Sequence, residues 1–365
     1  MTHAVTRHRQ RRPISSSYGY GNARVRGMRS RMITSDTFEQ VMKCWDLGDA
    51  VELLAPTDYG PDIDEALLEG GVKPSSIDEA FKENMVRTYR KVLDFVSAEA
   101  RTILGTLLGK WDLLNIKTVL RGVHMGLAPE EIEESLIAAG AMSAIELREL
   151  AHRRDVRDVV DTLVIWDVDY AHALNESIVE YVRTSDLAVL ELALDRFYSK
   201  WATKRLAGKG HNYATARRIL AVQIDAVDLV TVFRVQKADM RSEEAKRFFL
   251  PGGLHVTERL FADLVQMSDI DEVLARLART PYERVLVEAV KTYAEHGTIS
   301  TLERALEDHL MRKALAVGTG DALGVGVLIS YLWAKQNEVT NLRIVIRGIA
   351  SGMTEKRMKE ELILV

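Results

Sequence analysis

Three short stretches of this 365-residue chain carry residue types that bind phosphates or metal ions in other proteins. The first, Gly105 to Lys110 (GTLLGK), imitates a phosphate-binding loop, but its spacing is one residue short and no Ser or Thr follows the lysine. It also falls where a helix is expected to end, not after a strand. We therefore predict no phosphate-binding loop at this position.

The second stretch is a run of glycines at positions 318, 320, 324 and 326. Their spacing differs from the G-x-G-x-x-G of a dinucleotide-binding turn, and no strand is expected before them. We interpret these glycines as small residues that allow two helices to pack closely.

The third stretch contains Asp167, Asp169 and His172, which are types that ligate metal ions. The two aspartates are two residues apart and diverge on a helix, which favours a solvated face. The chain has no H-E-x-x-H, no Cys pair and no G-x-S-x-G, and its nine His match no nucleophile pattern. We predict no catalytic, cofactor-binding or metal-ligating residue, no cofactor and no small-molecule substrate, so the chain is not expected to be an enzyme.

One segment recurs along the chain with a fixed period. Residues 112–136 (DLLNIKTVLRGVHMGLAPEEIEESL) align without gaps with residues 338–362 (EVTNLRIVIRGIASGMTEKRMKEEL), and a weaker copy begins at residue 225 (DAVDLVTVFRVQKADM). We call each copy a signature segment. The matching positions are Asn115, Asp228 and Asn341; Arg121, Arg234 and Arg347; Gly122 and Gly348; and Gly126 and Gly352. The copies start 113 residues apart in both cases, which indicates a unit of domain size used three times.

The repeated arginines allow two interpretations. Each lies near the end of its helix, where a guanidinium group can bind terminal carbonyls and interact favourably with the helix dipole. We favour this structural role for Arg121, Arg234 and Arg347. In the alternative, they border a central opening and contact a partner protein.

The glycines of the signature segment predict how its helix ends. Gly126 and Gly352 occupy positions where a helix C-terminus favours positive φ. In the middle copy Val235 and Asp239 replace the two glycines, so that helix is expected to end with a different turn.

The surrounding residues predict helices throughout. Each repeat unit, of which the signature segment is one part, opens with two short helices. Asp46, Asp155 and Asp269 are expected to cap the second of these helices. Longer helical stretches follow at residues 77–108, 187–222 (interrupted by Gly208 and Gly210) and 302–333, with the signature helix after each. No run of alternating apolar and polar residues is long enough to predict a strand. The predicted fold is all-α, with three similar helical domains in tandem at residues 18–140, 141–253 and 254–365.

Composition narrows the possible partners. The formal net charge of −4 gives no general attraction to nucleic acid or anionic lipid. Cys44 is the only cysteine, which excludes an internal disulfide. The longest apolar run, residues 324–334, is about half of the ~20 residues that a membrane span needs.

The first 35 residues contain no Asp or Glu. We predict that residues 1–17 form a basic, disordered tail; the alternative is an organellar transit peptide, although a clear apolar face is missing. Arg24, Arg26, Arg29 and Arg31 follow in the same acid-free stretch. We expect them to contact acidic loops or lipid headgroups, and a solvated face is the alternative.

These motifs together resemble a known family. EVTNLRIVIRG at residues 338–348, GYGNARVRG at residues 19–27 and the 113-residue period are similar to the C subunit of A-type (archaeal) ATP synthases. The same family includes the C subunit of bacterial V-type enzymes and the d subunit of eukaryotic vacuolar ATPases. The resemblance covers residues 18–365.

The resemblance implies a funnel-shaped socket of three helical domains around a pseudo-threefold axis. It implies a non-catalytic component of the central stalk, placed peripherally on the cytoplasmic face of the membrane. The implied partners are the proteolipid (c/K) ring, the D and F subunits of the shaft, and the membrane surface. Two rivals are a general helical-repeat scaffold with other partners and a nucleic-acid binder using the arginine-rich start; the negative body disfavours the latter, and we expect no nucleic acid partner.

Overall fold

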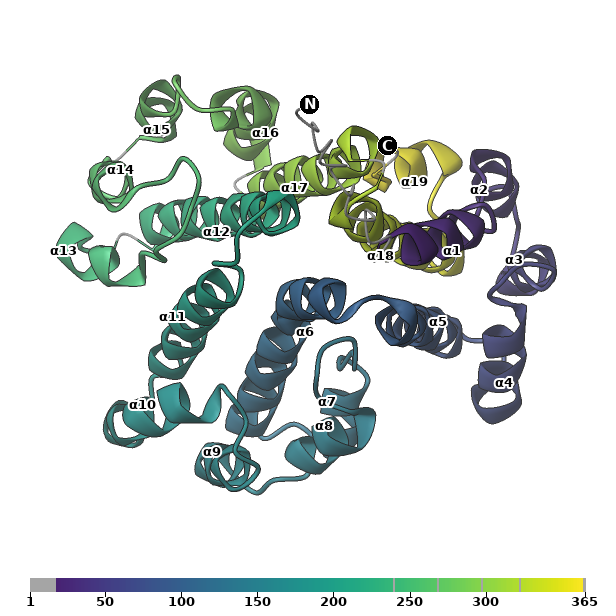
Figure 1. The fold of residues 1–365 in the computed structure, drawn as a ribbon, viewed down its shortest axis with the longest axis horizontal. Coiled ribbons are helices and arrows are strands. Elements are labelled where there is room, and N and C mark those ends of the chain that lie inside the picture. Colours follow the sequence, from purple (N-terminus) through teal and green to yellow (C-terminus); the bar gives the residue numbers. More distant parts are fainter. Residues whose placement is uncertain (1–17, 239, 268, 297, 322, 364–365) are drawn as a thin grey trace, which may run out of the picture.

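The computed structural model describes residues 18–363 except 239, 268, 297 and 322, and all regular elements in these residues are helices (Figure 1). The all-α prediction is confirmed. The predicted tail at residues 1–17 and Asp239 lie outside the described residues. The helices are α1 Gly19–Arg29, α2 Ser35–Val41, α3 Leu47–Leu54, α4 Gly60–Gly70, α5 Pro74–Phe95, α6 Ala98–Met125, α7 Pro129–Glu133, α8 Ala144–Ala151, α9 Val156–Ile165, α10 Ala171–Thr184, α11 Ala188–Arg205, α12 His211–Lys237, α13 Ser242–Ala245, a 3-10 turn η1 Lys246–Phe248, α14 Glu258–Leu264, α15 Ile270–Arg276, α16 Tyr282–His296, α17 Ser300–Gly320, α18 Val325–Ala350 and α19 Glu355–Glu361.

Side-chain caps fix the starts of the short helices. Asp46 and Asp155 accept hydrogen bonds from the backbone N–H three residues on, at 3.0 and 2.8 Å, and Asp269 accepts one from the N–H of Asp271 at 3.0 Å. Each satisfies one of the backbone donors that a helix start leaves free. The three predicted N-caps are therefore confirmed.

The long helices begin earlier than the sequence suggests. Apolar spacing predicts one stretch over residues 77–108 before the signature helix, but the chain breaks at Val96, and Ser97 caps α6. Residues 302–333 likewise divide between α17 and α18. Each signature segment thus begins with the second half of a helix of 28, 27 or 26 residues. The interruption expected at Gly208 and Gly210 separates α11 from α12, as predicted.

The three long helices α6, α12 and α18 meet near the middle of the molecule (Figure 1). Each packs against two of the helices α5, α11 and α17: one precedes it in the chain and the other belongs to the next copy of the repeat. The second kind of contact joins α6 to α11, α12 to α17, and α18 back to α5. Short helices lie in three groups around this centre, formed by α2–α4, α7–α10 and α13–α16 (Figure 1). None of the described helices combines the length and the apolar content that a membrane crossing requires.

Apolar packing runs across the predicted domain boundaries. One large cluster contains residues from Tyr18 to Leu362, and a second joins the C-terminal half of α12 to α14–α17. The boundary predicted at residues 253/254 falls between Phe249 and Val256, which both contact the second cluster. The division at 140/141 and 253/254 therefore remains a prediction about the sequence repeat.

Candidate functional site

The three repeated arginines form equivalent ion pairs with carboxylates of other helices. Arg121 binds Glu191 through Nε and Nη2 at 2.5 and 2.6 Å. The other two pairs are Arg234 with Glu303 (Nε 3.1 Å, Nη2 2.6 Å) and Arg347 with Asp78 (Nε 2.9 Å). Forked contact of this kind fits the planar guanidinium group. The favoured interpretation, that these arginines bind carbonyls of their own helices, is wrong, because each guanidinium group binds a carboxylate of a different helix.

The pairs make a closed cycle. The first links α6 to α11, the second links α12 to α17, and the third links α18, near the C-terminus, back to α5. In the third pair the two residues are 269 positions apart. A second interaction accompanies the first and third pairs: Lys117 lies 2.5 Å from Asp195, and Arg343 lies 3.4 Å from Asp78. The arginine positions thus tie each copy of the repeat to the next and the last to the first.

Asn115 and Asn341 each bind the backbone of the residue 22 positions later. The Asn115 amide donates to the Ile137 carbonyl at 2.7 Å and accepts from the Ile137 N–H at 2.9 Å. Asn341 makes the same two bonds with Ile363, at 3.0 and 3.1 Å. Each asparagine therefore holds the chain that leaves its signature helix against that helix.

The middle copy has Asp228 at this position, and its contacts differ. Oδ1 accepts from the Leu250 N–H at 2.9 Å, but Oδ2 is buried and has no hydrogen-bond partner among the described residues. Burial raises the pKa of Asp228 to about 8, against the lowering effect of the Leu250 hydrogen bond. At neutral pH the carboxyl group is therefore mostly protonated, so the buried Oδ2 carries no charge.

Acidic residues at the first position of each signature segment bind the backbone just before the next short helices. The acceptors and their donors are Asp112 with the N–H groups of Ala141 and Met142 (2.8 and 2.9 Å), Asp225 with those of His255 and Val256 (2.9 Å each), and Glu338 with that of Ile33 (2.6 Å). Asp225 also accepts from the Tyr282 hydroxyl at 2.8 Å, and Glu338 from the Tyr59 hydroxyl at 2.6 Å. Sequence reasoning assigns no role to these residues. Their 113-residue spacing is the signal that could have found them.

Comparison with known proteins decides the family. The family model described as "ATP synthase (C/AC39) subunit" matches residues 21–361. The chain belongs to this family. Among relatives named as the C subunit of an A-type ATP synthase, that of Methanocaldococcus jannaschii is 28% identical over 347 residues, covering 95% of this chain and 86% of the relative. Those of Methanococcoides burtonii and Halorubrum lacusprofundi are each 28% identical, covering 96% of this chain and 95% and 98% of the relatives.

As a member of the ATP synthase C/AC39 family, the chain is a non-catalytic component of the synthase, in agreement with the expectation that it is not an enzyme. The residues that resembled a phosphate loop lie inside α6, where Lys110 donates to Gln336 of α18 at 2.9 Å. Burial lowers the pKa of Lys110 to about 8. Within the described residues no group of three or more His, Cys, Asp or Glu is placed to hold a metal ion, and Asp169 instead accepts from Trp201 Nε1 at 2.9 Å.

The glycines of this C/AC39 protein have two different structural roles. Gly126 and Gly352 have φ of +68° and +69°, the left-handed conformation that the sequence predicts at these helix ends. Gly122 and Gly348 allow close packing, because a Cβ would lie 2.5 Å from Ile132 Cγ1 and 2.6 Å from Met358 Sδ. In the middle copy the equivalent position is Asp239, which lies outside the described residues, so the different turn expected there stays a prediction.

The arginines of α1 and the turn after it lie at the surface and bind neighbouring parts of the protein. Arg24 stacks on Phe95, with Cζ 4.3 Å from the ring centroid. Arg29 donates to Ser330 Oγ at 3.1 Å, and Arg31 pairs with Asp58 at 3.0 Å. Arg26 is exposed. These contacts fasten α1 to α5, α18 and the turn before α4, and contact with an acidic loop or a lipid headgroup stays a prediction for all four arginines.

Proposed function

We propose that this chain is the central-stalk component that couples the proteolipid ring to the D/F shaft of a rotary A/V-type ATP synthase. It turns with the ring during proton- or sodium-driven ATP synthesis, or during ATP-driven ion pumping. It sits peripherally on the cytoplasmic face of the membrane as a socket of three helical domains, with boundaries at residues 140/141 and 253/254. Family membership supports a place in the synthase.

The observation that carries the proposal is the closed cycle of arginine–carboxylate pairs. A protein that transmits torque needs resistance to shear between its parts. A chain whose last copy binds back to its first, as Arg347 binds Asp78, resists shear at every junction, whereas an open row of domains has two free ends. Dense helix packing adds stiffness because packed interiors resist compression.

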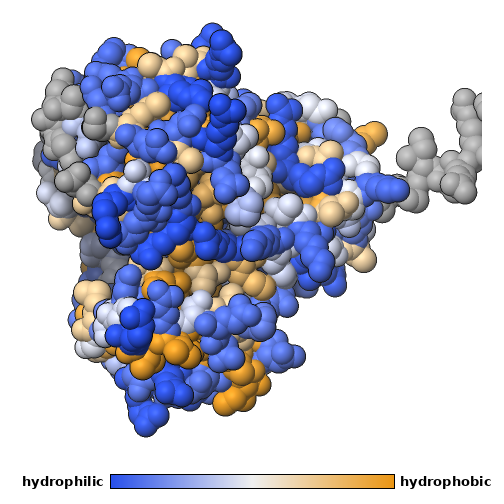
Figure 2. Space-filling model, turned by 90° about the vertical axis from the view of Figure 1, so that its left-hand side faces the viewer, coloured by the Kyte–Doolittle hydropathy of each residue, from blue (hydrophilic) through white to orange (hydrophobic). Residues whose placement is uncertain are grey.

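Exposed apolar side chains support the proposal that the chain binds another component of the complex. Figure 2 shows apolar side chains gathered at the lower end of one face, where α9 and α10 lie. These helices expose Ile165, Val179 and Val182, of which Ile165 is 80% exposed. Apolar side chains that gather on a protein surface mark interaction sites. The proposal assigns this surface to another component of the synthase.

Purification of the tagged full chain from its own membranes in mild detergent tests the proposal. We expect the proteolipid ring and the D and F subunits to remain bound. Capture of unrelated proteins without ring or shaft components would instead favour the general scaffold.

A charge exchange tests the role of the cycle in coupling. Glu191→Arg alone is expected to lower ATP-driven ion pumping relative to ATP hydrolysis, and Arg121→Glu combined with Glu191→Arg is expected to recover it. Equal pumping per ATP in wild type and the single variant would contradict a mechanical role for the cycle.

A further inference from the structure

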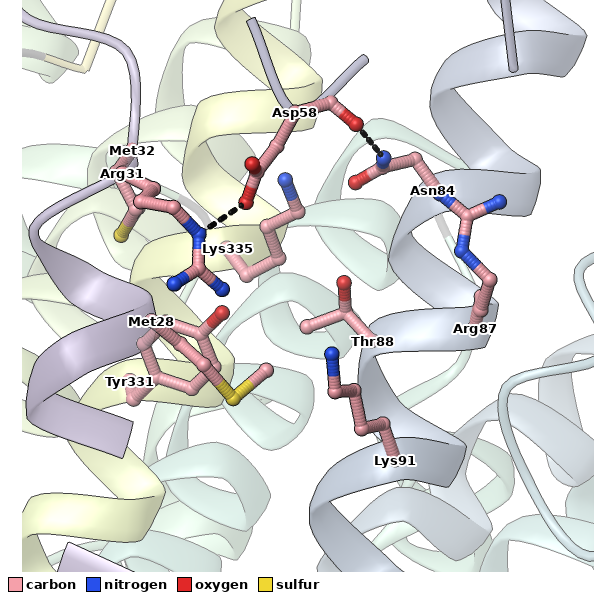
Figure 3. A pocket seen from close by; sticks show the side chains of 10 residues that line it. All are labelled: Met28, Arg31, Met32, Asp58, Asn84, Arg87, Thr88, Lys91, Tyr331 and Lys335. Carbon is pink, nitrogen blue, oxygen red and sulfur yellow. Dashed lines mark hydrogen bonds and ion pairs between the residues drawn. The ribbon is translucent and has the colours of Figure 1, made fainter. Parts of the chain in front are cut away.

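A cavity of about 230 Å³ opens at the seam between the first and last copies of the repeat, where α1, α5 and α18 meet (Figure 3). Four of its lining side chains are cationic: Arg31, Arg87, Lys91 and Lys335. Met28, Met32 and Tyr331 supply an apolar wall. The family match and the cycle of ion pairs described above do not involve this cavity.

The cations outnumber the carboxylates that pair with them. The pairs are Arg31 with Asp58 (Nε–Oδ2 3.0 Å), Arg87 with Asp62 (Nη2–Oδ2 2.6 Å) and Lys335 with Glu338 (Nζ–Oε1 2.9 Å). The Lys91 ammonium has no hydrogen-bond or ion-pair partner in the part of the chain that the structure describes. The cavity therefore carries one positive charge that an anion would neutralise.

Hydrogen-bond donors surround the space beside Lys91. Thr88 lies three residues before Lys91 on the same face of α5 and also lines the cavity. Arg31 uses Nε for Asp58 and Nη1 for the Gly27 carbonyl, and its guanidinium group faces the cavity (Figure 3). Two cationic groups and one hydroxyl group from two parts of the chain thus point at a common volume.

One acceptor in the cavity also has no partner. Asn84 is 2% exposed, and its Nδ2 donates to the Asp58 carbonyl and to Asp62 Oδ2, at 2.8 Å each. These bonds fix the orientation of the Asn84 amide and leave Oδ1 as its free acceptor. It is buried, has no hydrogen-bond partner among the described residues and points toward the cavity (Figure 3). A buried acceptor of this kind calls for a ligand that supplies a proton.

We propose that this cavity binds a phosphate group that carries a hydroxyl, either as protonated inorganic phosphate or as a phosphate monoester. Lys91 and Arg31 bind its anionic oxygens, the Thr88 hydroxyl donates to one of them, and Asn84 Oδ1 accepts the P–O–H proton. Sulfate has the same shape, but at neutral pH it has no proton to donate. The site therefore distinguishes phosphate from sulfate by the Asn84 acceptor.

Binding of phosphate strengthens the closure of the chain. Arg31 follows α1 near the start of the described chain, Lys91 lies on α5, and the cavity wall at Tyr331 belongs to α18. A ligand held by Arg31 and Lys91 cross-links two elements that meet α18 at the seam. The protein with phosphate bound is then more stable than the free protein, because the ligand binds only the folded chain.

Calorimetry and thermal unfolding of the full chain in phosphate or sulfate at equal ionic strength test the site. Lys91→Met removes the unpaired charge. Lys204→Met is the matched control, because Lys204 lies 113 residues later on α11, is exposed and does not line this cavity. We expect phosphate to bind wild type and the control equally, and Lys91→Met and Thr88→Val to bind it more weakly, by about tenfold for the lysine. Sulfate should bind wild type about tenfold more weakly than phosphate.

Vesicles distinguish the two sources of a phosphate monoester. Phosphatidylcholine vesicles with phosphatidic acid should bind wild type if a lipid headgroup is the ligand, and glycerol 3-phosphate should compete. Binding of inorganic phosphate without such vesicle binding assigns the site to a soluble phosphate. Unchanged phosphate affinity in Lys91→Met, equal affinity for sulfate, or no binding of phosphate or these vesicles would overturn the proposal.

Discussion

Arg347 near the end of α18 binds Asp78 near the start of α5 through Nε at 2.9 Å, and this pair joins the last copy of the repeat to the first. Asp78 is almost fully buried and also lies 3.4 Å from Arg343 Nε. The corresponding pairs of Arg121 and Arg234 join consecutive copies of the repeat. The third pair therefore links α18 to α5, which no loop of the chain connects directly.

Loss of the Asp78 charge is expected to weaken the seam. Asp78→Asn leaves two guanidinium groups without their shared carboxylate. The free energy of unfolding should fall by about 2 kcal/mol, since a buried charged partner is removed while the arginines stay partly solvated. Denaturant unfolding monitored by circular dichroism measures this change.

The control is Asp161→Asn, because the pair of Asp161 with Arg157 is exposed on both sides and 4.0 Å long. Its loss should change the free energy of unfolding by less than about 0.5 kcal/mol. Equal effects of the two substitutions would show that the seam pair is worth no more than a surface pair.

Asp228 should make the stability depend on pH. Its folded-state pKa of about 8 is above the ordinary 3.8 of the unfolded chain. Between these values the folded state keeps a proton that the unfolded state has lost, so the stability that this group contributes falls as pH rises through that window. Asp228→Asn is uncharged at every pH and should remove this slope. At pH 8 it should be more stable than wild type by at least about 1 kcal/mol.

The reciprocal substitution provides the check. Asn115→Asp removes the amide donor to the Ile137 carbonyl and should introduce the same downward slope. Unfolding measured at a series of pH values compares each variant with wild type. Parallel pH profiles for wild type and Asp228→Asn would contradict a protonated Asp228.

Features set by local chemistry could be predicted from the sequence. The caps at Asp46 and Asp155 depend on bonds to residues three positions away, and the positive φ of Gly126 depends on its own lack of a Cβ. The break at Ser97 could not be predicted, because apolar spacing continues across it. Helical periodicity alone does not show where one helix stops and a second begins.

The partners of the arginines could not be predicted in this way. Glu191, Glu303 and Asp78 differ in length and lie on helices distant in sequence from the arginines they bind. The 113-residue repeat identifies the arginines, but only packing of α6 on α11, α12 on α17 and α18 on α5 brings the carboxylates to them.

The signature glycines should differ in their tolerance of alanine. A Cβ at Gly122 meets Ile132, a buried branched side chain, whereas a Cβ at Gly348 meets Met358, which is flexible. Gly122→Ala should therefore destabilise by about 1–3 kcal/mol, and Gly348→Ala by less. Thermal unfolding gives the order of the two effects.

Gly105→Ala is the control, because Gly105 lies inside α6 with nothing within 4 Å of its Cβ. This substitution should instead stabilise the protein by about 0.5–1 kcal/mol. A destabilised Gly105→Ala or a fully tolerated Gly122→Ala would contradict the packing argument.

The Tyr59–Glu338 bond is expected to hold the first short helices on α18. Both groups are buried, and the hydroxyl donates to Oε1 at 2.6 Å, while Oε2 accepts from the Ile33 N–H. Tyr59→Phe leaves the carboxylate one donor short inside the protein, so the free energy of unfolding should fall by about 1–3 kcal/mol.

Tyr331→Phe is the matched control for this prediction, because Tyr331 is also buried but its hydroxyl has no hydrogen-bond partner in the described part of the chain. It should change stability little. Because Glu338 binds the chain between α1 and α2, Tyr59→Phe should also speed amide hydrogen exchange in α1–α4. The effect in α7–α10 should be smaller, because the carboxylate that binds the backbone there is Asp112. Uniform exchange rates in both groups of helices would show that the seam does not open as a separate unit.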